Sequence, residues 1–188
     1  MSLPLDDPRP APSERDGLVD YLEYYRQVLR RKVDGLSSAD LNRTVGASTL
    51  TLGGIIKHLS LVEYSWFLED ILGEDLPEPF ATIDWRADPD WDFHSAADDS
   101  LQDLLDLHET ACAAARRVLD GVDDLDQELV RRRHGHVHNV RWVLIHMIEE
   151  YARHAGHADL IRESIDGSVG DCHHAPETAV NRRSGRCI

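Results

Sequence analysis

Cysteines and long apolar runs are scarce in this sequence, and each shortage excludes a class of protein. The chain of 188 residues has only 3 cysteines, and the wide spacing of Cys112, Cys172 and Cys187 fits neither a disulfide framework nor a zinc knuckle. No apolar run approaches the ~18 residues that a transmembrane helix needs. The GxSxG serine motif and glycine-rich phosphate loops are missing, and no segment alternates between polar and apolar residues as a half-buried strand does.

The chain is strongly acidic. It has 35 acidic residues against 20 basic ones, and its formal net charge is -15. Nucleic-acid binding needs a basic footprint, so DNA and RNA are not expected as partners. The first residues, MSLPLDDPRP, lack the charged-then-apolar pattern of a signal peptide. We therefore expect a cytoplasmic protein that acts on a small molecule and has no membrane partner.

Four long segments carry apolar residues at helical spacing. They run from about Glu14 to Val33, from Ile55 to Gly73, from Ser95 to Leu119 and from Asn139 to Ile165. Asn139 is a good N-cap, while Gly121 and Gly167 end the last two segments. Helices of this length predict an all-α, antiparallel four-helix bundle over residues 14–167. Residues 1–13 are expected to be flexible, and residues 168–188 to form a mobile tail.

A long connection, GEDLPEPFATIDWRADPDWDFH, joins the second and third predicted helices. A connection of this length inside a compact domain is either functional or disordered. Its two tryptophans, Trp85 and Trp91, favour a packed segment that lies over the bundle like a lid.

Histidine is unusually frequent, with 11 residues. In the fourth predicted helix, HMIEEYARHAGH places His146, Glu150, His154 and His157 at steps of four, four and three. At about 100° per residue, these side chains fall within a sector of roughly 80°. The same side carries apolar residues and should face the core, where a carboxylate and imidazoles are unfavourable without partners.

A divalent metal ion is a partner that suits these side chains. Imidazole and carboxylate groups at positions i and i+4 of a helix can bind one ion, and a bundle site takes a further ligand from a facing helix. His58, on the apolar side of the second predicted helix, is the candidate for that ligand. The predicted metal ligands are therefore His58, Glu150 and His154. Three protein ligands leave positions open for water or substrate, as catalytic sites require.

Simpler interpretations remain open. His58 also fits a hydrogen-bonded core residue, and Glu150 with His154 fits an ordinary ion pair along a helix. His134, His136 and His138 fit a polar loop before the last helix, while His94 and His108 have no partner that the sequence reveals. Cys112, in the Ala-rich stretch TACAAA, fits a core position better than a nucleophile.

Three segments resemble the DinB/YfiT-like superfamily, and its actinobacterial mycothiol-transferase-like branch above all. They are TLTLGGIIKHLSLVEYSWF, DWRADPDWDF and RWVLIHMIEEYARHAGHADLIRESIDG. The resemblance implies a four-helix bundle with a metal ion bound by His58 and His154. Glu150 stands where many members have His, and the mycothiol-dependent maleylpyruvate isomerases of the superfamily are similar in using Glu there. Members are often dimers, so the resemblance also implies a possible homodimer.

The resemblance implies thiol chemistry. A metal-bound low-molecular-weight thiol such as mycothiol would be held as a thiolate and would attack an electrophile. On this interpretation His157 serves in catalysis as an acid/base or orienting group, or as a fourth ligand. Trp85 and Trp91 either cover the bound thiol and its substrate or pack in the core. The metal, for example Zn, Ni or Fe, cannot be chosen from two imidazoles and a carboxylate.

Two other functions compete with the thiol transferase. The first is a non-catalytic metal-binding or scaffold bundle, in which the histidines are only hydrogen-bonded. The second is a metal-dependent hydrolase that activates water and needs no thiol.

Overall fold

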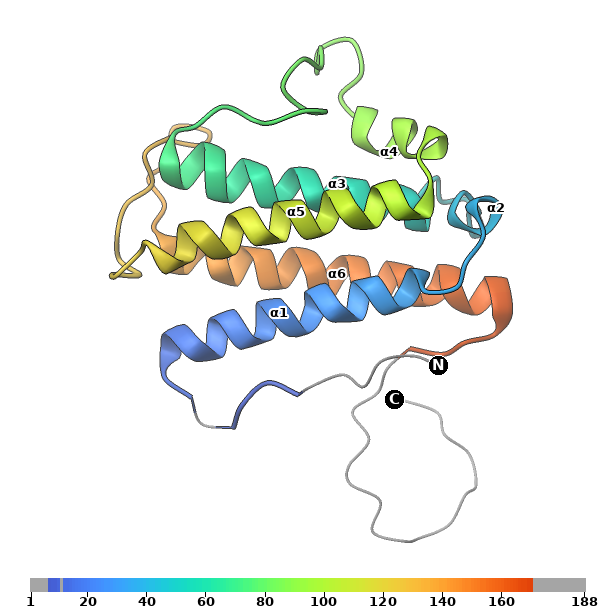
Figure 1. The fold of residues 1–188 in the computed structure, drawn as a ribbon, viewed down its shortest axis with the longest axis horizontal. Coiled ribbons are helices and arrows are strands. Elements are labelled where there is room, and N and C mark those ends of the chain that lie inside the picture. The colour runs from blue at the N-terminus through green and yellow to red at the C-terminus, as the bar shows by residue number, and fades with distance from the viewer. Residues whose placement is uncertain (1–6, 11, 171–188) are drawn as a thin grey trace, which may run out of the picture.

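The protein is a bundle of four long helices, which the computed structural model describes for residues 7–10 and 12–170 (Figure 1). The long helices are α1 (Glu14–Val33), α3 (Leu52–Tyr64) with its π-helical continuation η1 (Ser65–Leu72), α5 (Leu101–Asp120) and α6 (Val140–Asp166). Three short ones are α2 (Ser38–Leu41), α4 (Trp91–Ser95) and η2 (Ala96–Asp98). Within the described ranges there is no strand, only isolated bridges, which confirms the all-α prediction.

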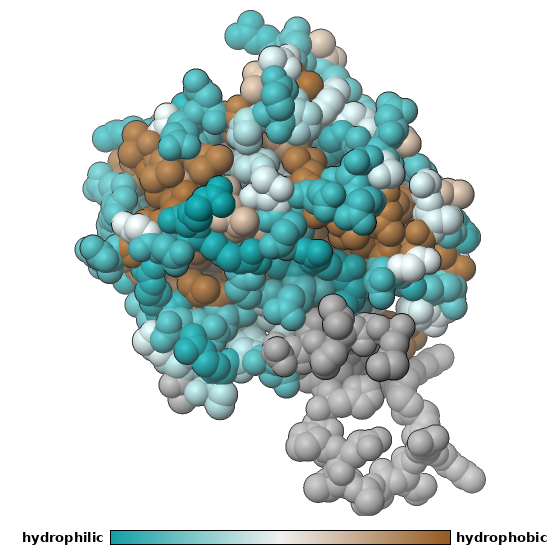
Figure 2. All heavy atoms as spheres, viewed as in Figure 1, coloured by the Kyte–Doolittle hydropathy of each residue, from teal (hydrophilic) through white to brown (hydrophobic). Residues whose placement is uncertain are grey.

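No helix in the described part of the chain is long and apolar enough to cross a membrane. On the face drawn in Figure 2, hydrophilic residues separate the areas in which apolar residues are exposed. The segments that the sequence predicts to be flexible, 1–13 and 168–188, lie mostly outside the described residues.

Local signals set most helix ends as predicted. The side chain of Asn139 accepts a hydrogen bond from the Trp142 N–H and begins α6. Gly167 ends that helix with a φ of 77°, in the left-handed region that glycine adopts without strain. Gly121 is the C-cap of α5, as predicted.

The predicted start of the third helix at Ser95 is wrong. Ser95 is the last residue of α4, a helix that the periodicity does not reveal. The long helix α5 begins only at Leu101, because Ser100 and Asp103 form a reciprocal capping box there.

The long helices do not all run antiparallel to their neighbours. Arg141 pairs with Glu14 at the start of α6 and α1, and Lys32 pairs with Asp159 near their ends, so these two helices run in the same direction. Helices α3 and α5 also run in one direction, since the connection after η1 returns the chain along the bundle (Figure 1). The predicted antiparallel packing holds for α3 against α6, the pair that carries the candidate site.

The connection between η1 and α5 is packed, as its aromatic residues predict. Phe80 is 1% exposed and lies 6.2 Å, between ring centroids, from both Tyr64 and Trp91. Trp85 packs edge-on against Trp91 at 6.2 Å. This apolar cluster fixes α4 against the outside of α3.

A polar network lies in the core between the long helices. Glu63 of α3 is fully buried and accepts two hydrogen bonds from the guanidinium of Arg26, at 2.7 and 2.6 Å. It also accepts one from the Tyr151 hydroxyl at 2.7 Å. Because that proton goes to Glu63, the hydroxyl oxygen accepts in turn from His108 Nε2 at 2.8 Å. The network gives His108 the partner that the sequence does not reveal.

Burial controls the protonation of this network. Burial raises the pKa of the Cys112 thiol, and the charge of Glu63 raises it further, so Cys112 is a protonated core residue as predicted. Burial and the nearby charge of Arg26 lower the pKa of His108 to about 3. His108 is therefore neutral in the folded protein at every moderate pH.

Stability should fall as pH decreases below the ordinary histidine pKa of 6.5 and towards about 3, because His108 takes up a proton only when the chain unfolds. The contribution of one such group approaches about 1.4 kcal/mol per pH unit. His108→Gln removes the titrating group and should make the free energy of unfolding decrease less steeply over this range. Urea denaturation at a series of pH values measures both slopes, and equal slopes would contradict the assignment.

Candidate metal centre

Three side chains converge between α3 and α6. His58, Glu150 and His154 each offer a donor atom, and these three atoms lie within 4.8 Å of one another. His154 Nε2 lies 3.6 Å from Glu150 Oε2, and the rings of His58 and His154 have centroids 5.1 Å apart. The three residues that the helical spacing selects therefore lie together.

Asp92 of the short helix α4 orients His58. Its carboxylate oxygen Oδ2 lies 2.7 Å from His58 Nδ1, and the residue is only 3% exposed. This contact engages Nδ1 and leaves Nε2 of the same ring available. A carboxylate behind a histidine is the usual arrangement around a bound metal ion, because it fixes the tautomer and makes the imidazole more basic.

Phe93 covers one face of His58, with ring centroids 4.6 Å apart and planes 23° apart. The approach of α4 depends on Gly54, since a Cβ atom there would lie 3.0 Å from Phe93 Cδ1. Gly54 thus allows α4 to bring both Asp92 and Phe93 to the histidine.

The site keeps His154 in the form that binds metal. Burial lowers the pKa of His154 to about 4, and the nearby His58 and His157 add to this effect. Metal ligands must be deprotonated, so a neutral imidazole is ready to bind. Nδ1 of His154 and Nδ1 of His157 are buried and make no hydrogen bond within the described part of the chain. Unpartnered buried nitrogens are costly, and a ligand in the site would offset that cost.

A second group, His146 with Glu149 and Glu150, also brings donor atoms together. Glu149 is mostly engaged elsewhere, because it is exposed and its carboxylate pairs with Arg153. His146 Nε2 lies 3.6 Å from Glu150 Oε1, so this group shares Glu150 with the first one and borders it.

The comparison with known families agrees with this geometry. A family model described as mycothiol-S-transferase matches residues 17–167. The chain belongs to the mycothiol-S-transferase family. The match covers the whole bundle and confirms the resemblance on which the expectation of thiol chemistry rests. A comparison with curated proteins gives no significant match.

In this family member the two predicted cofactor-binding tryptophans lie together, Trp91 in α4 and Trp85 in the connection before it. Trp91 lines a hollow of about 350 Å³, together with Lys57, Ser95, Asp99 and other residues. Lys57 directly precedes His58 and Trp91 directly precedes Asp92 in the chain, but none of the three candidate ligands lines this hollow. Trp85 packs against Trp91 and supports it from the apolar cluster.

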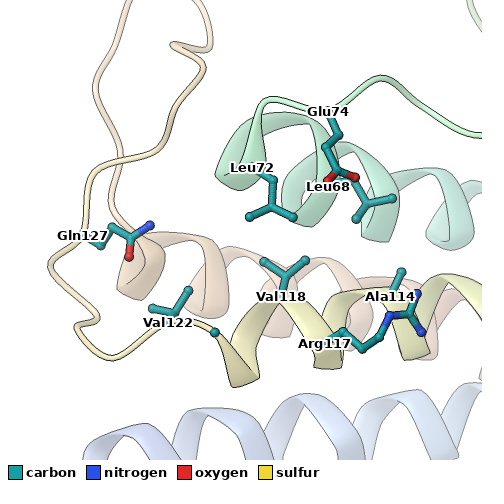
Figure 3. A pocket seen from close by; sticks show the side chains of 9 residues that line it. Leu68, Leu72, Glu74, Ala114, Arg117, Val118, Val122 and Gln127 are labelled. Carbon is teal, nitrogen blue, oxygen red and sulfur yellow. The ribbon is translucent and has the colours of Figure 1, made fainter.

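Another hollow, of about 290 Å³, lies at the far end of the bundle (Figure 3). Its lining comes from η1, the end of α5 and the segments that follow each of them, with Leu68, Leu72 and Val118 facing one another. None of the three candidate ligands lines it, so it is separate from the centre.

Sequence reasoning missed Asp92 and Phe93, since nothing in the periodicity marks α4 as a helix that contacts His58. A buried Asp between two aromatic residues was the available signal. The remaining histidines have other roles or lie elsewhere: His94 contacts Asp88 on the surface at 3.0 Å, and His173 and His174 lie outside the described residues.

Asp92→Asn should lower the affinity for zinc by about 10- to 100-fold, because the neutral amide makes His58 a weaker ligand. Titration against a chromophoric chelator measures this affinity. Asp88→Asn is the matched control, since Asp88 contacts only the exposed His94 among the histidines. Equal affinities for both variants would show that Asp92 does not support the site.

Proposed function

We propose that the protein is a metal-dependent S-transferase, which joins a low-molecular-weight thiol such as mycothiol to an electrophilic small molecule. The observation that carries the proposal is the convergence of His58, Glu150 and His154 within 4.8 Å, in a chain of the mycothiol-S-transferase family. A thiol of this kind is reduced in the cytoplasm, and the protein is proposed to act there.

The donor set of two imidazoles and one carboxylate suits Zn, Ni or Fe, and it leaves positions open for a substrate. A bound divalent ion would lower the pKa of a thiol ligand and favour the nucleophilic thiolate. Asp92 keeps the His58 ring in one orientation, and Phe93 shields one face of that ring from water. Glu150 supplies negative charge to the site between His146 and His154.

His157 is proposed to take the proton that the thiol loses. Its ring lies 5.4 Å from that of His154, between centroids, and its buried Nδ1 has no hydrogen bond in the described part of the chain. The thiolate sulfur then forms a bond to an electrophilic carbon. The electron pair that this carbon gives up departs with a leaving group or moves into a conjugated carbonyl, which takes up a proton.

Trp91 and Trp85 are proposed to hold the non-reacting part of the thiol. Trp91 provides an aromatic wall to the hollow of about 350 Å³, and Lys57 lies 4.5 Å from its ring centroid. The carboxylates of Asp99 and Asp103 and the Ser95 hydroxyl add polar groups to the same hollow. An aromatic face with surrounding polar groups is typical of sites for small polar ligands.

Metal-loaded protein should accelerate thioether formation between mycothiol and an alkylating reagent, relative to chelator-treated protein. His58→Ala and His154→Ala should each lower metal content and reduce the rate at least about 100-fold, since metal activation supplies several kcal/mol. His94→Ala is the matched control, because His94 is exposed and pairs with Asp88. Metal analysis and product formation are measured on the same preparations.

The competing functions give different results in the same assay. Hydrolysis of the electrophile without added thiol would favour the metal-dependent hydrolase. Bound metal with no turnover of either kind would favour the non-catalytic bundle. A second variant, His58→Gln, is measured in parallel. Circular dichroism of both variants then separates loss of folding from loss of metal.

A further inference from the structure

A strip of aromatic side chains runs along α6 from its N-terminus to the candidate metal centre. His138, Trp142 and His146 follow one another at steps of four, and Glu150 and His154 continue the same spacing. Side chains four residues apart lie on neighbouring turns of one helix face. The end of the strip contacts the centre, because His146 Nε2 lies 3.6 Å from Glu150 Oε1.

The rings of the strip contact one another in order, with Trp142 tilted against His138 and stacked on His146. The centroid of Trp142 lies 4.2 Å from that of His138 and 4.9 Å from that of His146, and the planes of Trp142 and His146 are only 21° apart. Trp66 of η1 packs against the strip from below, 5.2 Å from Trp142 and 4.9 Å from His146. Trp66 is 4% exposed, whereas Trp142 is 40% exposed. The structure thus holds a tryptophan ring in a fixed orientation with part of its surface open.

The charge next to the strip is compensated. The guanidinium of Arg133 lies 4.1 Å from the centroid of Trp66, and its Nε pairs with the buried Asp70 at 2.9 Å. An anionic ligand would have to compete with that carboxylate. The most exposed ring of the strip is the neutral indole of Trp142, which favours flat, uncharged, unsaturated groups.

We propose that this strip binds the aromatic or conjugated part of an uncharged electrophile and directs its reactive carbon towards the candidate metal centre. The inference rests on the proposed thiol transfer, because it names the class of the second substrate. A small molecule is favoured over a protein partner because the strip leads directly to the centre, through a single line of side chains on α6. A second copy of the chain, covering Trp142, would be detected by the test below.

The test compares two enones, one with an aryl substituent and one with a methyl substituent at the same position. The thiolate sulfur bonds to the β-carbon, the electron pair of the double bond moves towards the carbonyl, and the α-carbon takes up a proton. Dividing each catalysed rate by the rate with thiol alone removes the difference in intrinsic reactivity. The wild type should prefer the aryl enone.

Trp142→Ala should lower kcat/KM for the aryl enone by about 10-fold, chiefly through KM, and leave the methyl enone nearly unchanged. Trp142→Phe should retain most of the preference, since it keeps a π face. Ile145→Ala is the matched control: Ile145 is 54% exposed on the same helix but lies outside the strip. An equal loss for both enones, an unchanged preference, or a change in oligomeric state would overturn the proposal.

A binding measurement keeps the strip testable if neither enone reacts. The saturated aryl ketone cannot add a thiol, and its affinity is measured by equilibrium dialysis with wild type and Trp142→Ala. If the ketone binds more weakly to Trp142→Ala but not to Ile145→Ala, the strip is a ligand site even when the proposed transferase activity fails. Equal binding to wild type, Trp142→Ala and Ile145→Ala contradicts the strip, whatever the enzyme does.

Discussion

The buried carboxylate of Glu63 is the group on which the arrangement of the bundle depends. A charge with no solvent exposure costs several kcal/mol unless its oxygens are paired. Its partners come from three other helices: the guanidinium of Arg26 from α1, the hydroxyl of Tyr151 from α6 and, at 3.8 Å, the thiol of Cys112 from α5. A rotation of α6 by one residue would turn Tyr151 by about 100° and leave the carboxylate with one partner fewer. The pairing therefore sets the rotation of α6, and with it the direction in which Glu150 and His154 face.

The candidate centre also depends on a buried carboxylate that pairs with a side chain of another helix. His58 needs a partner for one nitrogen, and α4 supplies the carboxylate of Asp92, which is itself buried. The missing side chain of Gly54 lets α4 come close enough. The long connection after η1 thus contributes side chains to the candidate site. It supplies a carboxylate to the candidate site that α3 and α6 do not provide, and its Trp91 lines a hollow of its own.

Helical spacing placed Glu150 and His154 on one face of α6, because positions four apart on one helix meet at one face whatever the rest of the chain does. His58, on α3, was a candidate only because a bundle site takes a ligand from a facing helix, and the family resemblance supported it. Asn139 and Gly167 were equally predictable, since capping depends on neighbouring residues. The roles of Asp92 and His108 could not be predicted in this way, because their partners are distant in sequence. Asp92 contacts His58, and His108 contacts Tyr151. The shared direction of α1 and α6 follows from a connection that runs back along the bundle, which periodicity does not record.

The central claim is that two imidazoles and one carboxylate hold a metal ion that activates an external thiol. X-ray absorption spectroscopy of the zinc-loaded protein, before and after addition of mycothiol, tests it most directly. The account predicts only nitrogen and oxygen ligands at first, with scattering from two imidazoles, and one new sulfur at about 2.3 Å when mycothiol is added. A sulfur ligand already present without mycothiol, or an unchanged spectrum after its addition, would contradict the account.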